Sequence, residues 1–153
     1  IILVAGLLLQ LVLRKLLFYP IKVSSDSMAP EIQSGHKRYF IHPKLTTVVL
    51  GDIVLVRPNS AEADFLCRVA AVDGDKVKIA AGQFFVNGQV KKIFEPRLQI
   101  PEDRSFYMPE IEVRPNYFFC LNENFRNSRD SRTAGIFERG QITAKVFRPT
   151  LFF

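Results

Sequence analysis

Three serine hydroxyls and one carboxylate lie side by side in residues 24–27, and Met28, Ala29 and Pro30 follow them. A serine hydroxyl becomes a nucleophile when a neighbouring group takes its proton, so this segment is a candidate for acyl-transfer chemistry. It is equally typical of a polar linker, because Ser, Asp and Pro favour turns. The residues themselves leave both interpretations open.

A second polar cluster, with the sequence NFRNSRDSR, occupies residues 124–132. Its amide and carboxylate groups favour Asx-type turns, and its arginines are suited to binding a carboxylate through two parallel hydrogen bonds. Such bonds predict a polar loop held together by its own side chains. A solvated surface loop is the alternative that the composition also allows.

Two histidines and two cysteines are further candidates for proton transfer or metal binding, namely His36, His42, Cys67 and Cys120. A histidine can act as a base at neutral pH, but both histidines fall in a segment typical of surface turns. The cysteines have no metal-ligand spacing, so we expect neither a metal nor another cofactor. We expect two buried thiols, with a disulfide as the alternative in an oxidising compartment.

The elements that must position these residues begin with an apolar N-terminal segment. Residues 1–13 contain a single polar side chain, and Arg14 and Lys15 follow. A helix needs about 20 apolar residues to span a bilayer. Because the sequence begins at an isoleucine, we expect a membrane anchor that runs from residue 1 to Tyr19 and is truncated upstream. A cleaved signal would end in small residues instead. The two basic side chains would reach the headgroups, and Phe18 and Tyr19 would lie at the interface.

From Pro20 onward, short strand-like runs alternate with turn signals, and no long helical periodicity occurs. Asn87 and Gly88 form a two-residue hairpin signal. The pattern predicts an all-β antiparallel domain of Greek-key or barrel type over residues 20–153. Residues 94–112, which contain three prolines, are expected to be a loop or small appendage. The expected strands cover residues 52–56, 65–72, 76–80, 84–86, 89–91, 117–121 and 141–147.

Composition restricts the classes of partner. A chain of 153 residues with 48% hydrophobic and 24% charged residues has the composition of one folded domain, which excludes a disordered tail and a polytopic membrane protein. The net charge of +6 suits nucleic acid or an anionic bilayer. The basic residues are scattered and carry no nucleic-acid-binding signature, so we expect a lipid bilayer and no nucleic acid.

Five motifs occur in an order that resembles the type I signal peptidases, which are membrane-anchored serine proteases that remove signal peptides from exported proteins. They are an S-x-S-M-x-P segment at 25–30, a G-D-I-V segment at 51–54, a K-R-V-x-G-x-x-G-D-like segment at 67–75, a V-N-G hairpin at 86–88 and a G-D-N-x-x-x-S-x-D-S-R-like box at 122–132. The resemblance covers nearly the whole chain and implies the signal-peptidase-like β fold behind an N-terminal transmembrane helix.

The resemblance also implies roles for individual residues. Ser27 takes the nucleophile position, and the Ser25 hydroxyl with the Ser27 backbone N–H takes the position of the oxyanion hole, where charge develops on the scissile carbonyl. Met28 takes a position that lines the substrate cleft. The box supplies structural support, with Asp130 and Arg132 expected to form a bidentate pair. The supporting positions are Asn124, Ser128, Asp130, Ser131 and Arg132.

One position departs from the family pattern. The general base of the family is a lysine whose pKa is lowered by desolvation, and Cys67 stands at that position. A neutral thiol cannot accept the proton of Ser27, and a cysteine side chain is much shorter than a lysine side chain. Other motif positions also differ, including Ala71 and the Asn122-Glu123-Asn124 start of the box. Scattered changes of this kind indicate natural divergence.

Two hypotheses of different classes follow. The first is a signal-peptidase-like membrane protein without Ser/Lys chemistry, which binds exported precursors or serves as a structural subunit of a membrane complex. The second is an active serine endopeptidase that cleaves signal peptides with a relocated base. A group near Ser27 able to take its proton would distinguish the second from the first. In both, the β domain faces the trans side, which is the periplasm, the cell exterior or the intermembrane space.

Overall fold

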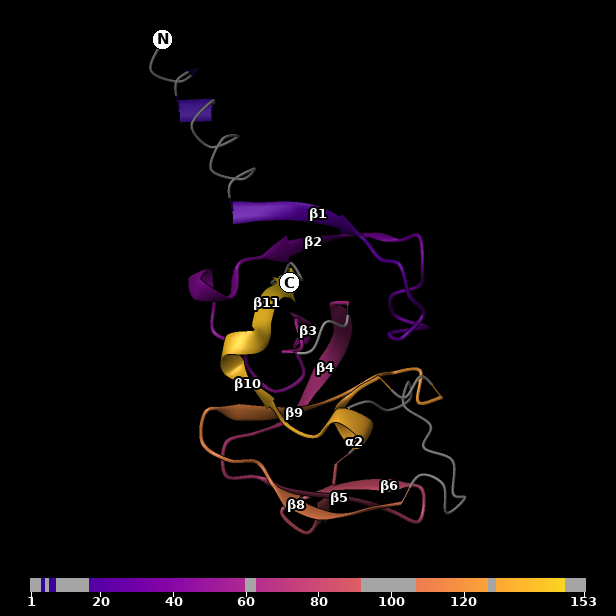
Figure 1. Ribbon diagram of the computed structural model, residues 1–153. Helices are drawn as coiled ribbons and strands as arrows, with labels where there is room; N and C mark the ends of the chain where they lie inside the picture. Colours follow the sequence, from indigo (N-terminus) through magenta and orange to yellow (C-terminus); the bar gives the residue numbers. More distant parts are fainter. Residues whose placement is uncertain are drawn as a thin grey trace, which may run out of the picture.

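The computed structural model of this chain describes residues 4, 6–7, 17–59, 63–91, 107–126 and 129–147. Two antiparallel sheets dominate these residues, a large one above and a small one below in Figure 1. The large sheet has seven strands in the order β1-β2-β11-β3-β4-β9-β10, and the small sheet has four in the order β7-β6-β5-β8. The prediction of an all-β antiparallel fold is confirmed.

Most of the expected strands begin and end within one or two residues of an observed strand. The strands are β1 (Phe18–Lys22), β2 (Lys37–Ile41), β3 (Ile53–Val56), β4 (Phe65–Val72), β5 (Lys76–Ala80), β6 (Gln83–Val86), β7 (Gln89–Val90), β8 (Met108–Glu112), β9 (Tyr117–Leu121), β10 (Phe137–Glu138) and β11 (Ile142–Val146). In the described part of the domain the short helices are η1 (Pro43–Leu45), α2 (Ser131–Ala134) and η3 (Arg139–Gln141).

Strand β4 lies in the interior of the large sheet, between β3 and β9, and is buried along almost its whole length. Its run of apolar residues suits a strand covered on both faces. Because successive side chains of a strand point to opposite faces, Leu66 packs with Met28 and Phe40 in one apolar cluster. Cys67 packs with Phe118 in another. The two faces of β4 therefore serve different cores.

Strands β1 and β2 were not among the expected strands. Strand β1 forms the edge of the large sheet, where Pro20 is tolerated because the ladder bond it cannot donate is not needed there. Phe18 and Tyr19, expected at a membrane interface, belong to this strand. The Phe18 ring contacts Phe147 with centroids 4.4 Å apart, and the Tyr19 ring lies 6.3 Å from that of Phe40.

The predicted anchor falls largely on residues that the structure does not describe, including Arg14 and Lys15. Within the described part of the chain, no helix has the length and apolar character that a membrane span requires.

The small sheet contains the predicted hairpin. One of its strands also lies in the segment that was expected to be a loop or appendage. Asn87 and Gly88 have φ angles of 54° and 75°, the positive values that a type I′ turn requires. Residues 94–112 were expected to form a loop or appendage, but residues 108–112 form β8 and pair with β5. Pro109 fits because β8 is an edge strand, and Met108 is buried in the core. Residues 94–106 lie outside the described part.

Candidate functional site

A closed loop between β1 and β2 presents Ser27. The N–H of Val23 donates to the carbonyl of His36 over 2.9 Å, and the N–H of Gly35 donates back to Val23 over 2.8 Å. The Asp26 carboxylate accepts from the N–H of Ser34 at 2.8 Å and ties the two sides together. These bonds hold the loop closed, so Ser27 is 3% exposed and fixed in place.

The hydroxyl of Ser27 lies within a short chain of hydrogen bonds. Ser25 Oγ donates to Ser27 Oγ at 3.0 Å, and Ser27 Oγ donates to the backbone carbonyl of Leu66 at 3.3 Å. The N–H of Ser27 points back to Ser25 Oγ at 3.4 Å. A peptide carbonyl does not take up a proton at neutral pH, so the acceptor of the Ser27 proton is not a base.

A cavity of about 250 Å³ lies beside Ser27. Three of its residues carry ionisable side chains: Lys22 at the end of β1, Asp64 before β4 and Arg129 from the box. Its remaining walls come from β1, β2, β3, β4 and the loop of residues 23–36 between β1 and β2, which we call the serine loop. The lining residues are Ile21, Lys22, Val23, Ser24, Ser25, Ser27, Phe40, Leu55, Ala63, Asp64, Phe65, Leu66 and Arg129.

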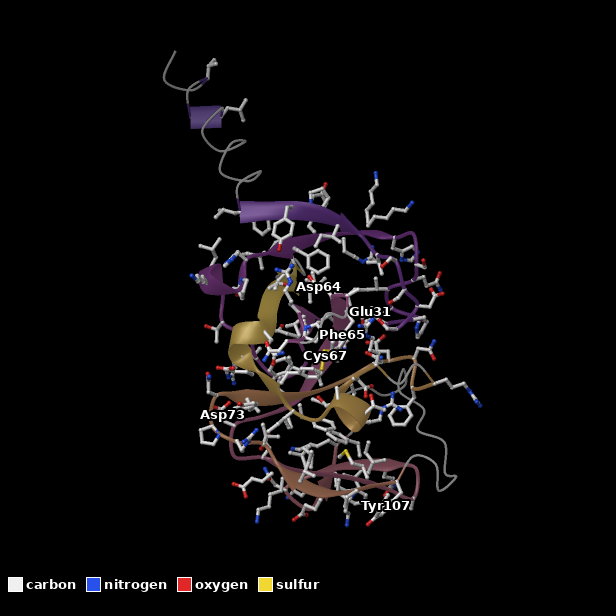
Figure 2. The ribbon with its side chains drawn as sticks, in the orientation of Figure 1. Glu31, Asp64, Phe65, Cys67, Asp73 and Tyr107 are labelled. Carbon is white, nitrogen blue, oxygen red and sulfur yellow. A yellow bond between two sulfur atoms is a disulfide. The ribbon has the colours of Figure 1, made fainter. Side chains whose placement is uncertain are left out.

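The cavity continues into a larger cleft of about 800 Å³, which shares Ile21, Leu55 and Asp64 with it. Both oxygens of Asp64 accept from Arg57, at 3.0 and 2.9 Å. The guanidinium of Arg129 lies over the ring of Phe65, 5.7 Å from its centroid. Figure 2 shows Asp64, Phe65 and Cys67 in the same central region of the molecule, with Tyr107 far below at the small sheet.

Met28, expected to line the substrate cleft, is completely buried. It packs in the apolar cluster under the serine loop and is not among the residues that line the cavity. Its backbone carbonyl accepts from the N–H of Ile32 at 2.8 Å, which closes a turn inside the loop. The structure gives Met28 a packing role.

Cys67 and Cys120 form a disulfide between β4 and β9, with Cα atoms 5.7 Å apart. The expectation of two buried thiols is therefore wrong. The two strands are direct neighbours, and the pairing of Val69 with Cys120 brings the sulfurs to one face of the sheet. A disulfide sulfur carries no proton and is no thiolate, so Cys67 can serve neither as the base for Ser27 nor as a nucleophile of its own.

The two histidines stabilise turns. His36 Nδ1 accepts from the N–H of Gln33 at 3.3 Å, and His42 Nδ1 accepts from the N–H of Lys44 at 3.2 Å. Neither imidazole hydrogen-bonds Ser27. Within the described residues, no group of three or more His, Cys, Asp or Glu side chains is arranged to hold a metal ion.

Asp130 and Arg132 form the bidentate pair that was expected. Arg132 Nη2 and Nε lie 2.8 and 2.9 Å from the carboxylate oxygens of Asp130. The same carboxylate caps α2 by accepting from the N–H of Arg132, and it also accepts from the N–H of Asn122 at 2.9 Å. The predicted polar loop therefore contains one helical turn, held by its own side chains.

The other supporting positions join the box to its surroundings. Ser131 Oγ accepts from the N–H of Cys120 at 2.9 Å. The N–H of Asn124 donates to the carbonyl of Ser27 at 3.0 Å, and its side-chain amide donates to the carbonyl of Asp26 at 3.3 Å. Asn124 thus fixes the serine loop against the box. Ser128 lies outside the described residues.

Glu31, Arg68 and Glu123 form a largely buried charge cluster that was not expected from the sequence. Arg68 Nη2 lies 2.6 Å from Glu31 and also binds Glu123, while Nη1 donates to the carbonyl of Gly51 at 2.7 Å. Burial raises the pKa of the Glu123 carboxyl, and the nearby guanidinium of Arg68 opposes that rise. The replacement of the family's aspartate by Glu123 in the box was the available signal.

Comparison of the chain with protein families shows which family it belongs to. A family model described as "Signal peptidase, peptidase S26" matches residues 1–151. The chain belongs to the signal peptidase family. Signal peptidase I S of Bacillus subtilis strain 168 is 31% identical over 95% of this chain and 85% of its own length. A probable signal peptidase I-1 of Synechocystis is 27% identical over 92% and 75%.

The fold agrees with that membership. A crystal structure of a signal peptidase I from Enterococcus faecalis V583 matches with a TM-score of 0.55 and 17% identity, covering 67% of this chain and 98% of its own. Of the residues to which the sequence resemblance gave roles, Asp130 and Arg132 form their expected pair, and Cys67 is held in the disulfide with Cys120.

Proposed function

We propose that this member of the signal peptidase family binds peptide segments of exported proteins, or joins a membrane complex as a structural subunit, without hydrolysing a peptide bond. The single observation behind the proposal is the disulfide at the base position. Acyl transfer by a serine requires a group that accepts its proton in the transition state. The Ser27 hydroxyl donates to a backbone carbonyl instead.

The ionisable residues of the cavity do not supply a substitute. Arg129 has a guanidinium group, which donates hydrogen bonds and has no acceptor atom, so it does not supply a base. Both oxygens of Asp64 are already bound by Arg57. A lysine acts as a base where burial removes water from its amine, and Lys22 is exposed.

An active serine endopeptidase is the second candidate, and one observation favours it. Lys22 lines the same cavity as Ser25 and Ser27 and carries a long, flexible side chain. Movement of Lys22 toward Ser27 on substrate binding would supply the relocated base.

We also propose that the chain is anchored to a bilayer by one N-terminal span, with the β domain on the trans side. The disulfide supports this placement, because disulfides persist in oxidising compartments such as the periplasm and the cell exterior. The partners would be exported precursors, or a membrane complex, together with the lipid itself.

The experiment is cleavage of a radiolabelled signal-peptide precursor by the purified protein in detergent. Small residues occupy the −3 and −1 positions of the precursor. The unmodified protein is compared with Ser27→Ala and with a double variant, Cys67→Lys with Cys120→Ala, which restores a lysine and leaves no free thiol. We expect no cleavage above buffer by the unmodified protein.

Cleavage that disappears in Ser27→Ala would overturn the proposal and favour the second candidate, and Lys22→Gln would then test the relocated base. Cleavage by the double variant alone would indicate that the missing base is what separates this protein from an active peptidase.

A further inference from the structure

We infer that Glu31, Arg68 and Glu123 form a proton-dependent link between the serine loop and the box of residues 122–132. While the two carboxyl groups hold one proton, the link is closed and the loop is held. When that proton leaves, Glu31 moves out into solvent and the loop loosens. The inference goes beyond the proposed function, because it concerns what holds the serine loop and applies whether the site binds or cuts.

The link joins three segments that are far apart in the sequence. Glu31 belongs to the serine loop, Arg68 to β4 and Glu123 to the box. Arg68 Nη2 lies 2.6 Å from Glu31 Oε2 and also binds Glu123 Oε1. A single guanidinium nitrogen therefore holds the loop and the box together.

The same stretch of the box also binds the backbone of the serine loop. Asn124, the residue after Glu123, donates its N–H to the carbonyl of Ser27 at 3.0 Å. Its side-chain amide donates to the carbonyl of Asp26 at 3.3 Å. A change at Glu123 is therefore only one residue away from the bonds that fix Ser27.

The charges of the cluster do not balance when all three groups are ionised, because two carboxylates face one guanidinium. The Glu123 side chain is 1% exposed, and its Oε2 has no hydrogen-bond partner among the described residues. An excess negative charge in such a place is costly, and one proton removes it. Burial raises the pKa of the Glu123 carboxyl, Arg68 lowers it, and the neighbouring Glu31 raises it again.

Other charged groups lie on the elements around the cluster. They are Asp26 and His36 of the serine loop, Arg38 of β2, Asp52 with its partner Lys145, and Asp130 with its partner Arg132. The charges that shift the pKa of the Glu123 carboxyl are those of Arg68 and Glu31. The response to pH is therefore expected to depend on the carboxyl pair.

Exposure indicates which carboxylate leaves. The Glu31 side chain is 18% exposed and that of Glu123 is 1% exposed, so Glu31 is the one that can reach water. Its departure leaves Arg68 and Glu123 as one cation paired with one anion, which is the less costly arrangement of buried charge. Met28 and Ile32 remain buried in the core, so the loop loosens locally without unfolding.

The direction of the pH effect follows from where the proton binds more tightly. The closed link has the higher pKa, so it is favoured at low pH. Its stabilisation is complete below the pKa of the open state and is lost as pH rises through the pKa of the closed state. Each unit of difference between these two pKa values changes the ratio of closed to open molecules about tenfold.

The test is hydrogen–deuterium exchange of the full chain in detergent, followed by mass spectrometry from mildly acidic to mildly alkaline pH. Each exchange rate is divided by the intrinsic rate at that pH, which gives a protection factor. We expect the protection of residues 24–36 and of Asn124 to fall at least about tenfold as pH rises. The protection of β5, in the small sheet, should stay constant.

Glu31→Gln removes one carboxylate and leaves one cation with one anion, so protection of the serine loop should no longer depend on pH. Glu112→Gln is the matched control, because Glu112 is an exposed glutamate on β8 of the small sheet. It should keep the full pH dependence. Thermal unfolding of each variant checks that the fold is intact.

Protection of the serine loop that stays constant with pH in the unmodified protein would overturn the inference. Protection that rises with pH would contradict its direction, and a fall that persists in Glu31→Gln would exclude the carboxyl pair as its cause. These results are independent of the proposed function, because that is judged by precursor cleavage in a separate assay.

Discussion

Ser27 and Cys67, the two residues that the sequence resemblance places at the catalytic positions of a signal peptidase, differ in their surroundings. Ser27 keeps its buried loop, its hydroxyl partner Ser25 and its tie to Asn124. Cys67 lies in an apolar cluster and is covalently bound to Cys120. One position retains the polar geometry of a site, and the other has become part of the scaffold.

The two roles depend on different numbers of contacts within the fold. The serine loop is held by several backbone bonds and by contacts from the box, and a site that only binds peptides needs that same rigidity. The base role would depend on one side chain. Under the proposed function, the residue at that position stabilises the sheet instead, through the disulfide between β4 and β9.

The largest expected effect comes from removing the disulfide, in the double variant Cys67→Ala with Cys120→Ala. A cross-link between residues 53 positions apart is worth about 4 kcal/mol in the loop-entropy model. We expect a loss of about that size in the free energy of unfolding, measured with urea. Reduction of the unmodified protein should reproduce the loss, whereas the variant should be insensitive to reductant. Equal stability before and after reduction would contradict a scaffold role for Cys67.

Arg68→Leu should have the next largest effect. It removes the guanidinium between Glu31 and Glu123 and leaves the buried Glu123 carboxylate uncompensated. Loss of one partner from a buried ion pair costs about 3 kcal/mol. Urea unfolding measures the change. A loss below about 1 kcal/mol, the range of exposed ion pairs, would mean that water screens the charges of this cluster.

Glu123→Gln should change how stability depends on pH. Burial raises the folded-state pKa of Glu123 above its ordinary value of 4.5, with Arg68 and Glu31 facing the same carboxyl. The stabilisation that comes from the protonated carboxyl is complete below the unfolded pKa and is lost as pH rises through the folded one. The variant does not titrate here, so its free energy of unfolding should fall less between about pH 4 and pH 7. A steeper fall in the variant would contradict the direction of the shift.

Arg57→Gln should have the smallest effect and serves as the control for Arg68→Leu. Arg57 pairs with Asp64, but its side chain is 66% exposed. Exposed ion pairs contribute little to stability, because water and salt screen the charges. We expect a change in the free energy of unfolding that is much smaller than that of Arg68→Leu. A larger loss would mean that the pair organises the cavity wall, and Asp64 would then have to be counted with the serine loop.

Strands and turns could be predicted from the sequence where the residues of the segment itself determine its conformation. The apolar run of β4 and the Asn87-Gly88 turn carry their own signals. Strand β1 was missed because its aromatic start and Pro20 read as the end of an anchor. β8 was missed because its proline favours a loop, although an edge strand accepts it.

The site was predictable only in part. Asp130 and Arg132 are close in sequence, so their pairing could be expected from local spacing. The disulfide could not, because it depends on the register of β4 against β9 and on the irregularity between Val69 and Ala71. Register follows from the packing of both faces of a sheet, which a single sequence does not display. The position of Arg129 in the wall of the Ser27 cavity also depends on how distant segments pack, so it could not be predicted from local spacing.

The central claim is that the Ser27 hydroxyl has no base. The most direct measurement is labelling of Ser27 by a fluorophosphonate serine probe, followed by intact-mass and peptide mass spectrometry. It needs no knowledge of the natural substrate. The account predicts no labelling of the unmodified protein above that of Ser27→Ala across neutral and alkaline pH. Stoichiometric labelling at Ser27 that rises with pH through one ionisation would contradict the account, because it would reveal a group that takes the serine proton.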